Sequence, residues 1–393
     1  MKNFLKQLKN CSFPSVLSAA VLIVVVLTGV AWLIFGPKQD FSADENRTLE
    51  TSPKLSVDTV FDGSFMKSAE SFVGDQFLLR KQLVSLNTSL QLLLGKRDLA
   101  ENYSKEPVEG GVYYGKGGHI YEVLLPDKTG IFRENSTALK AFSQKAGIPL
   151  CILPVPSGSQ EQPENLPDYA PNHDQREELK MLQSGISGGT TVVDVFDALS
   201  LKKTGKDYYF KTDHHWNTYG AYVGYCALMN AMKVQPSPQS LFSYRTVKEP
   251  FFGTLYSKAI FSGQQPDVMQ IPYAENSGEI TQQIGKNLRK GLYWEDYLTQ
   301  KDKYSVYLGG NQSVTVVRNP SAKGGKLLIM KDSFANSMIP YLSTNFTEIH
   351  IVDLRYYNQD IYKYIKQNGI TKAAAIYSIK QLCDVSVANK LER

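Results

Sequence analysis

Residues 326–337 read Lys-Leu-Leu-Ile-Met-Lys-Asp-Ser-Phe-Ala-Asn-Ser. The short apolar run Lys326–Met330 predicts a buried strand, and Met338–Leu342 favours a helix. Ser333 would then lie where a buried strand meets a helix, at the carboxyl edge of a sheet, with helix N–H groups directed at the same space. A hydroxyl in that position is a candidate nucleophile for acyl transfer. The alternative is that Ser333 only caps the next helix, as serine often does.

Strand and helix patterns alternate on both sides of this stretch. Strand, loop, helix, strand is the order found in a parallel α/β sheet, in which ligands bind at the carboxyl ends of the strands. Residues 236–322 lose the alternation and carry short strand candidates separated by Gly, Asn, Pro and Lys, so we expect a β-rich insertion there. The other predicted elements are strands at 148–155, 190–195, 348–352 and 373–378 and helices at 136–146, 175–186 and 359–368.

A second dense motif, Asp213-His214-His215-Trp216, precedes a helical pattern at 221–232. An Asp that orients a His two residues later would supply the carboxylate and the base of a Ser-His-Asp relay. In an extended stretch residues two apart point to the same face, so Asp213 and His215 would face the site while His214 turns away. Trp216 would pack in the core or form a wall for a sugar ring.

The apolar segment Ser15–Phe35 contains no charged residue. At about 1.5 Å per residue it is long enough to span a hydrocarbon core of about 30 Å. Lys2, Lys6 and Lys9 precede it, so the positive-inside rule leaves residues 1–14 in the cytoplasm and the main domain outside. A cleaved signal peptide is the alternative, but the run is long and no small-x-small site follows it. We therefore expect a single uncleaved transmembrane helix at 15–35.

The remaining composition shifts predict the order of the domains. Residues 36–57 are polar and contain prolines, which is typical of a tether. Residues 58–100 carry apolar residues at intervals of three, four or seven, which predicts a helical segment packed on the main domain. The main α/β domain would then occupy 101–393 and include the β-rich insertion.

Composition excludes several classes of function. The 43 basic and 38 acidic residues are interspersed and give a net charge of only +5, so nucleic acid is not an expected partner. The four cysteines, Cys11, Cys151, Cys226 and Cys383, show neither a CxxC pair nor metal-ligand spacing. A disulfide framework and a cysteine metal site are therefore not expected.

The order Asp-x-His-Trp, long insertion, then strand-Asp-Ser-Phe-helix resembles the DHHW proteins and the alginate O-acetyltransferase group. These proteins are SGNH-hydrolase-like with a permuted motif order. The resemblance implies a three-layer α/β/α domain with a largely parallel sheet, and it covers nearly all of the chain after the apolar segment. Five further segments look like DHHW-family landmarks: Glu45-Asn46-Arg47, Phe72–Arg80, Phe252-Gly253-Thr254-Leu255, Leu308-Gly309-Gly310-Asn311 and Asp353-Leu354-Arg355.

Carried over residue by residue, the resemblance implies that Asp213 is the orienting carboxylate, His215 the general base and Ser333 the nucleophile, with no cofactor and no metal. SGNH esterases usually have a Gly before the Asp-Ser pair, whereas this chain has Lys331. That departure leaves the oxyanion donors unplaced, and Asn311 is the candidate side-chain donor.

Three other residues complete the candidate set for oxyanion or substrate binding: Trp216, Asp332 and Arg355. Asp332 directly precedes the expected nucleophile. Arg355 would hold an acidic substrate group or a neighbouring carboxylate, or form an ordinary surface ion pair.

The resemblance implies a serine O-acetyltransferase or esterase of the cell envelope, acting on acetyl groups of a cell-surface polysaccharide. A transferase would need a membrane-bound partner that delivers the acyl group. One alternative is a non-catalytic polysaccharide-binding or scaffold protein of a cell-envelope synthesis complex. The other is a metal-dependent phosphoesterase, because Asp213-His214-His215 also resembles the Asp-His-His motif of DHH phosphoesterases. Such sites need further Asp ligands, and the sequence shows no companion acidic motif.

Overall fold

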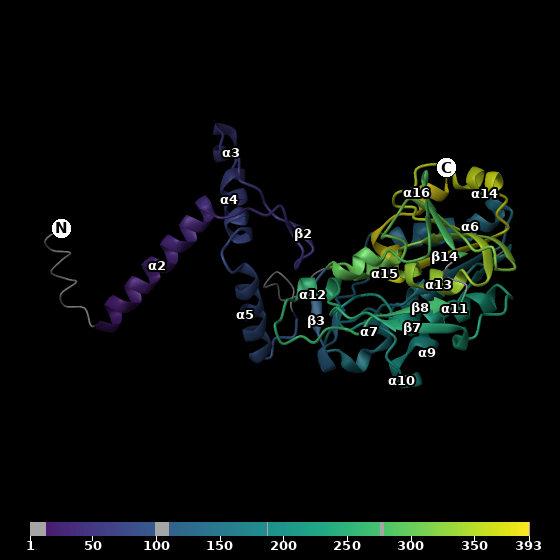
Figure 1. Cartoon of the computed structure of the whole chain (residues 1–393), viewed down its shortest axis with the longest axis horizontal. Coiled ribbons are helices and arrows are strands. Elements are labelled where there is room, and N and C mark those ends of the chain that lie inside the picture. Colours follow the sequence, from purple (N-terminus) through teal and green to yellow (C-terminus); the bar gives the residue numbers. More distant parts are fainter. Residues whose placement is uncertain (1–12, 99–109, 187, 276–278, 393) are drawn as a thin grey trace. The chain divides into compact units, whose positions relative to one another are not determined.

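A computed structural model describes residues 13–98, 110–186, 188–275 and 279–392. The chain divides into two compact units (Figure 1). The first is Met1–Leu93 with Ile260–Ser262, and the second is Leu94–Ala259 with Gly263–Arg393.

The first unit begins with the apolar helix α2, Phe13–Phe35. Its stretch Leu17–Phe35 has a mean hydropathy of 2.7 and is long and apolar enough to cross a membrane. The apolar helix expected at 15–35 is therefore present, and its place in a membrane stays a prediction. The other elements of this unit are β1 Phe41–Ser42, β2 Arg47–Thr48, α3 Val57–Phe61, α4 Ser64–Asp75 and α5 Arg80–Leu93.

Ion pairs organise the segment that composition marked as a tether. Arg47 donates to both carboxylate oxygens of Asp75, at 2.5 and 3.0 Å. Glu45 accepts from Arg47 at 2.8 Å and from Arg80 at 2.7 Å. Such bidentate, charge-assisted hydrogen bonds fix orientation as well as distance. The β1–β2 hairpin is thereby tied to the α4–α5 turn, which explains why Glu45–Arg47 and Phe72–Arg80 stand out as motifs.

The described part of the second unit contains an eight-stranded sheet in the order β10-β9-β11-β13-β12-β14-β5-β6. Neighbours from β13 to β6 are parallel, and β11, β9 and β10 extend that sheet with antiparallel pairs. The predicted α/β class with a largely parallel sheet is confirmed. The strands are β5 Leu150–Val155, β6 Thr190–Val192, β9 Thr281–Ile284, β10 Asn287–Lys290, β11 Val314–Arg318, β12 Gly324–Lys331, β13 Phe346–Val352 and β14 Lys372–Ser378.

Both faces of the sheet are covered, which makes three layers. Along β12 the side chains alternate: Leu327 and Ile329 join the core on one face, while Leu328 and Met330 join the core on the other. Helix α11, Thr218–Ala231, covers the first face, and α6 Ile131–Ala146 and α14 Ile361–Asn368 cover the second (Figure 1). Burial on both faces explains why residues 327–330 of β12 are all apolar.

The remaining elements are short. The predicted β-rich segment 236–322 supplies β7 to β11, of which β7 pairs with β8 and the other three join the main sheet. The other helices and strands are β3 Val112–Tyr114, β4 Ile120–Glu122, α7 Gly158–Glu161, α8 Arg176–Gln183, α9 Phe196–Leu199, α10 Leu201–Thr204, β7 Phe242–Thr246, α12 Thr254–Lys258, β8 Gln270–Ala274, α13 Ile339–Leu342, α15 Ile379–Asp384 and α16 Ala388–Leu391. The 3-10 helices are η1 Lys116–Gly118, η2 Pro163–Asn165, η3 Gln239–Leu241, η5 Glu295–Thr299, η6 Lys303–Val306 and η7 Ser333–Met338.

Candidate active site

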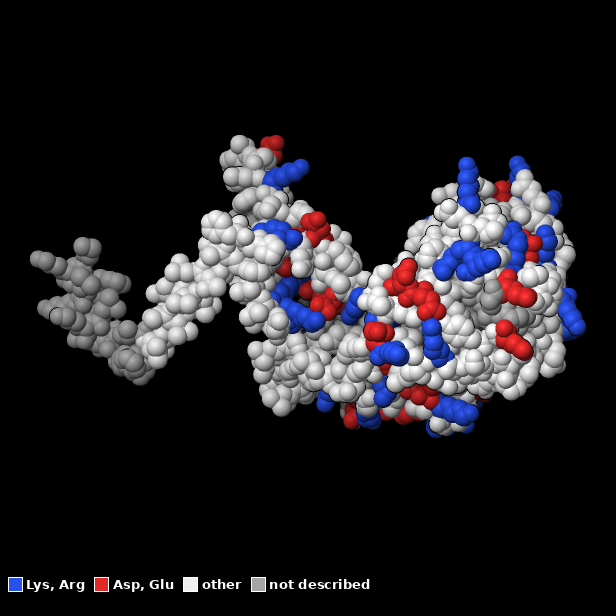
Figure 2. Space-filling model, viewed as in Figure 1, with Lys and Arg blue, Asp and Glu red and all other residues white. Residues whose placement is uncertain are grey.

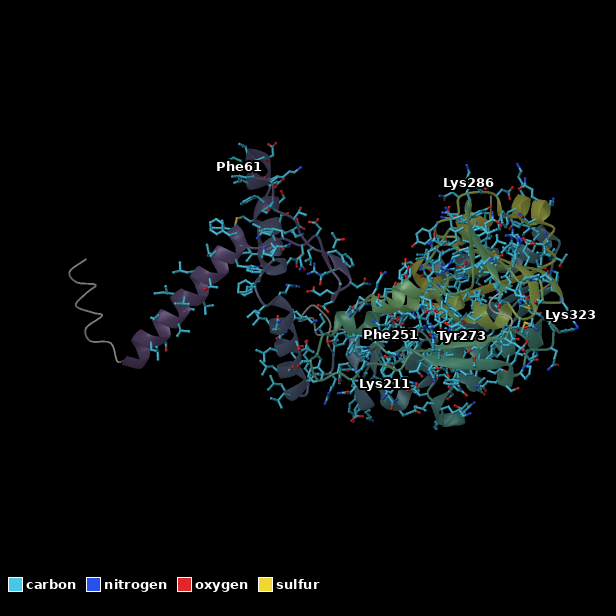
Figure 3. The ribbon with its side chains drawn as sticks, in the orientation of Figure 1. Phe61, Lys211, Phe251, Tyr273, Lys286 and Lys323 are labelled. Carbon is cyan, nitrogen blue, oxygen red and sulfur yellow. The ribbon has the colours of Figure 1, made fainter. Side chains whose placement is uncertain are left out.

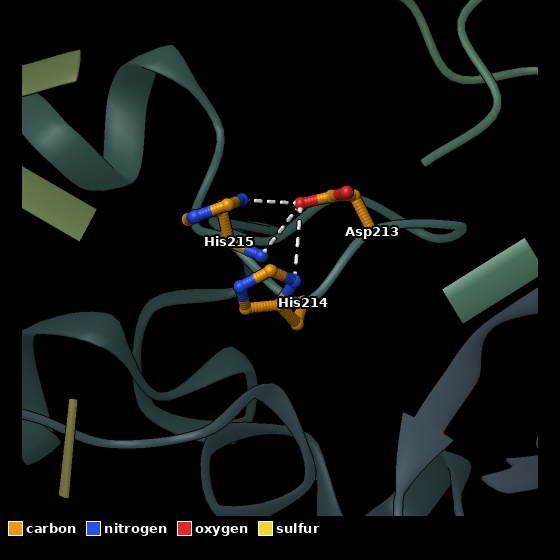
Figure 4. A group of neighbouring side chains, drawn as sticks. All are labelled: Asp213, His214 and His215. Carbon is orange, nitrogen blue, oxygen red and sulfur yellow. Dashed lines mark hydrogen bonds and ion pairs between the residues drawn. The ribbon is translucent and has the colours of Figure 1, made fainter. Parts of the chain in front are cut away.

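Asp213, His215 and Ser333 lie in one hydrogen-bonded chain. His215 Nδ1 is 2.5 Å from Asp213 Oδ1, and His215 Nε2 is 2.7 Å from Ser333 Oγ. Figure 4 shows one carboxylate oxygen of Asp213 facing a ring nitrogen of each of the two adjacent imidazoles. A carboxylate can only accept, so Nδ1 carries the proton and Nε2 accepts from the serine hydroxyl. The structure thus brings together the three residues that the sequence proposed as a relay, in the order that a relay requires.

Asp332, not Ser333, caps the helix that follows β12. One oxygen of Asp332 accepts from Phe334 N at 2.9 Å, and the other accepts from Ser378 N at 2.7 Å and Ser378 Oγ at 2.9 Å. The side chain of Asp332 is buried and both of its oxygens are engaged, so the predicted role in oxyanion or substrate binding is wrong. The amide of Phe334 is occupied by this hydrogen bond and is not free to stabilise an oxyanion. Asp332 instead fixes the turn from which the Ser333 hydroxyl projects.

The carboxylate of Asp213 is held from a second segment. Its Oδ2 accepts from Thr254 N at 2.8 Å and Thr254 Oγ1 at 3.2 Å. This approach requires Gly253, because a Cβ there would lie 2.1 Å from Asp213 Cβ. Burial alone would raise the pKa of Asp213, but the two imidazoles and the hydrogen bonds from His215 and Thr254 hold the pKa far below its ordinary value. Asp213 therefore stays ionised.

His214 does not turn away from the site, so that prediction is wrong. Residues 211–215 form bends, and the two-residue periodicity of an extended strand does not apply. His214 Nδ1 lies 2.7 Å from Thr254 Oγ1, and its ring centroid is 3.8 Å from that of His215. Burial, together with the nearby His214, lowers the pKa of His215 to about 4 against the opposing effect of Asp213. His215 is consequently neutral near pH 7 and able to accept a proton.

Trp216 lies in the core, which is one of the two alternatives that the sequence left open, and does not form a wall for a sugar ring. It is 0% exposed, and its indole N–H donates to Phe334 O and Ser337 Oγ, both at 3.0 Å. Gly224 of α11 allows the ring to pack closely, since a Cβ there would lie 2.7 Å from it. Trp216 therefore supports η7, the helix that begins with the nucleophile candidate.

Replacing Trp216 with phenylalanine is expected to lower the free energy of unfolding by about 1–3 kcal/mol, because Phe334 O and Ser337 Oγ both lose the hydrogen bond from the indole N–H. Urea unfolding of the variant and the parent chain measures this. Trp294→Phe is the matched control, since that partly exposed indole donates to one side-chain oxygen, of Gln282. A Trp216→Phe cost no larger than that of the control would contradict the supporting role.

Tyr304 is a site residue that sequence reasoning missed. Its ring stacks on His215, with centroids 3.8 Å apart and planes 9° apart. Its hydroxyl lies within hydrogen-bonding distance of Ser333 O, at 3.1 Å, and of Ser337 Oγ, at 3.0 Å. Tyr304 thus contacts both the base and the segment of the nucleophile. No local motif marks it, because its partners lie far away in the chain.

Two candidate substrate-binding residues, Asn311 and Arg355, contact the buried charges of Lys331 and Asp353. Lys331 Nζ donates to Asn311 Oδ1 at 2.7 Å and lies 3.5 Å from Asp353. An ammonium only donates, so the amide oxygen of Asn311 faces Lys331 and its NH2 group points elsewhere. Arg355 donates two hydrogen bonds to Asp353, at 2.6 and 2.9 Å. Of the three partners predicted for Arg355, the structure therefore shows the neighbouring carboxylate. The role of Asn311 as an oxyanion donor stays a prediction.

The metal alternative has a geometric basis. Donor atoms of Asp213, His214 and His215 lie within 4.8 Å of one another. Each of these donors already has a hydrogen-bond partner within the protein. His215 bonds Ser333 and Asp213, and Thr254 bonds both Asp213 and His214. A metal ion would have to displace those hydrogen bonds. The donor set fits a proton relay better than a metal centre.

The fold is a three-layer α/β/α arrangement, and the Ser-His-Asp chain lies at the end of β12, near the middle of its sheet. Residues 171–352 match the DHHW protein family, which confirms the resemblance drawn from the motifs. No curated protein shows significant sequence similarity to the chain.

Several solved structures are similar in fold to this chain. A DHHW family protein from Eubacterium siraeum has 22% identity and a TM-score of 0.62, over 72% of this chain and 94% of that protein. PatB1 from Bacillus cereus, solved with a sulfonyl adduct, has 20% identity and a TM-score of 0.58, over 69% of this chain and 95% of PatB1. The O-acetyltransferase domain of Pseudomonas putida AlgJ matches at 12% identity with a TM-score of 0.45, over 72% and 98% of the two chains, which is too weak to carry an argument. At these identities the likeness to the first two establishes the fold.

Proposed function

We propose that this protein is a membrane-anchored, extracytoplasmic serine acyltransferase or esterase that acts on acetyl groups of a cell-surface polysaccharide. The observation that supports it is the relay Asp213–His215–Ser333, with distances of 2.5 and 2.7 Å between successive side chains. A serine hydroxyl bonded to a neutral, carboxylate-oriented imidazole is the arrangement that makes serine nucleophilic.

In the first half of the proposed reaction, Ser333 Oγ attacks the carbonyl carbon of the acyl donor. His215 Nε2 takes the hydroxyl proton and returns it to the departing alcohol oxygen, which leaves an acyl group on Ser333. In the second half, water or a sugar hydroxyl gives its proton to His215 and attacks the acyl carbon. The bond from that carbon to Ser333 Oγ then breaks, and His215 returns the proton to Ser333 Oγ. Asp213 holds the Nδ1–H tautomer and stabilises the imidazolium. Asn311 is the proposed side-chain donor to the oxyanion.

The proposed location rests on the apolar N-terminal helix. Residues 17–35 are long enough to cross a membrane, and three lysines precede them in the sequence. The main unit would then face the cell envelope, where a polysaccharide substrate is present. The choice of acetyl, and of a membrane-bound partner that supplies it to a transferase, follows from the family resemblance.

The test uses the full chain in detergent with a chromogenic acetyl ester, with and without acceptor glycans. If the added glycan becomes acetylated as the ester is consumed, the protein is a transferase. If the glycan changes neither the rate nor the products of ester hydrolysis, the protein is an esterase. Glycan binding without any ester turnover would contradict the catalytic proposal and favour the polysaccharide-binding alternative. Activity that is abolished by chelation and restored by a divalent metal would contradict the relay and favour the phosphoesterase alternative.

The acid limb of the pH–rate profile is expected to lie well below the ordinary histidine range. Because the pKa of His215 is lowered to about 4, the imidazole stays neutral and competent as a base down to that pH. Turnover of the acetyl ester should therefore rise through about pH 4 and level off above it. His214→Gln removes a neighbouring charge that lowers this pKa, so the limb should move to higher pH. An unchanged limb in that variant would contradict the assignment of the limb to His215.

A further inference from the structure

Helix α5 has its polar side inward and its apolar side outward. It buries Ser85 and Thr88, and Ser85 Oγ accepts from Ser262 N at 2.9 Å within the same unit. Its exposed side chains include Leu83, Leu86 and Leu90, which are 48%, 55% and 50% exposed. A surface helix normally shows the reverse arrangement. The leucines of α5 therefore require a neighbour outside this unit.

Further exposed apolar side chains of this unit lie outside α5. Helices α3 and α4 bury no residue, and Phe61, which Figure 3 labels at the end of α3, is 88% exposed. Leu79, at the α4–α5 turn, is 57% exposed. In Figure 2 the left-hand side of α5 carries no charged atoms. We call this surface, formed by Phe61, Leu79, Leu83, Leu86, Leu90 and Leu93, the apolar face. Exposed apolar surface of this extent marks an interaction site.

Contacts with α2 indicate what covers the apolar face. Trp32 Nε1 donates to Gln76 O at 3.1 Å, and a Cβ added at Gly29 would meet the ring of Phe77 at 3.5 Å. Gly29 lies about 9 Å before the end of α2, at about 1.5 Å per residue. The α4–α5 turn thus touches α2 within the stretch that is apolar enough to cross a membrane. A bilayer around that stretch would reach the apolar face.

We infer that the apolar face lies in the outer interface of the bilayer, with the leucines of α5 among the lipid chains. The inference rests on the proposed membrane anchor. A helix with one apolar and one polar side lies in that interface with its apolar side toward the acyl chains. The spacing of Leu79, Leu83, Leu86, Leu90 and Leu93 also fits a coiled-coil seam with a second copy. The bilayer is favoured because the face extends over α3 and the α4–α5 turn and continues into the contact with α2.

The test is hydrophobic photolabelling of the full chain, reconstituted at low density in phosphatidylcholine vesicles that contain a lipid-soluble diazirine. Peptide mass spectrometry should find label on α2 and on the leucine side of α5. Leu86→Glu combined with Leu90→Glu should remove the label from α5 and leave it on α2. Asn87→Glu, on the same helix beside that face, should retain both.

Three results would overturn the inference. Label on α2 without label on α5 would place the apolar face outside the bilayer. Cross-links between α5 helices of two chains at low density would assign it to a second copy. An unlabelled α2 would remove the anchor and the inference together. Photolabelling does not depend on catalysis, so a failure of ester turnover would leave this result unaffected.

Discussion

Ser333→Ala is expected to lower turnover of an acetyl ester by about 10³-fold or more, since removing the nucleophile of a serine relay leaves only binding and oxyanion stabilisation. The substitution deletes one hydroxyl whose side-chain partner is His215 Nε2, at 2.7 Å. The fold should survive, because Asp332 rather than Ser333 caps η7. Initial rates of ester hydrolysis, with circular dichroism of the same samples, measure both expectations.

The control is Ser321→Ala, an exposed serine that donates to Glu279. It should retain full turnover. A sulfonyl fluoride provides a second readout that needs no substrate, because it reacts with an activated serine and adds a fixed mass. The parent chain and the control should be labelled at Ser333 and the alanine variant should not. Equal turnover in both variants would remove Ser333 as the nucleophile.

Gly253→Ala is expected to abolish most activity although residue 253 contributes no side chain to the reaction. A methyl group there would lie 2.1 Å from Asp213 Cβ and 2.3 Å from Asp213 Oδ2, far inside contact distance. Relief of that clash must move Asp213 or the Thr254 amide that holds it, which misorients the imidazole of His215. Overpacking of this kind costs about 1–3 kcal/mol of stability, and loss of the carboxylate's orientation costs rate in addition. The measurements are kcat for the acetyl ester and the urea unfolding midpoint.

Gly325→Ala separates this effect from a general intolerance of alanine. Gly325 lies in β12, and an added Cβ would meet only Thr371 Oγ1, at an ordinary 3.8 Å. That variant should keep both kcat and stability close to the parent values. If Gly253→Ala behaved like this control, the Thr254–Asp213 contact would not be what orients the relay.

The central elements were predictable because each depends on a local pattern. Residues 327–330 are apolar without interruption because β12 is covered on both faces, and the motif that follows the strand starts a helix at Ser333. The predicted pairing of Asp213 with His215 is also present in the structure, but it does not arise from the alternation of side chains along an extended strand. The backbone at 211–215 bends, and it is the hydrogen bonds to Asp213 rather than strand alternation that bring the two side chains together.

The surroundings of the relay were not predictable, because they depend on partners distant in the chain. Trp216 is buried because α11 and η7 close over it, and Asp332 is occupied because β14 ends beside it. Tyr304 stacks on an imidazole that lies in another segment. The residues next to Trp216, Asp332 and Tyr304 in the sequence do not indicate any of these contacts. The inverted helix α5 is similar: its periodicity predicted an apolar side correctly, but not that this side would face outward.

The hydrogen bonds between Asp332 and Ser378 allow the C-terminal strand β14 to help position Ser333. Since one oxygen of Asp332 is fixed by the last residue of β14, the serine beside it takes its position from two strands at once. A shift between those strands would move the hydroxyl away from His215 without altering any residue of the relay. The alignment of the relay therefore depends on the whole sheet. A substitution in β14 can abolish activity although Asp213, His215 and Ser333 are unchanged.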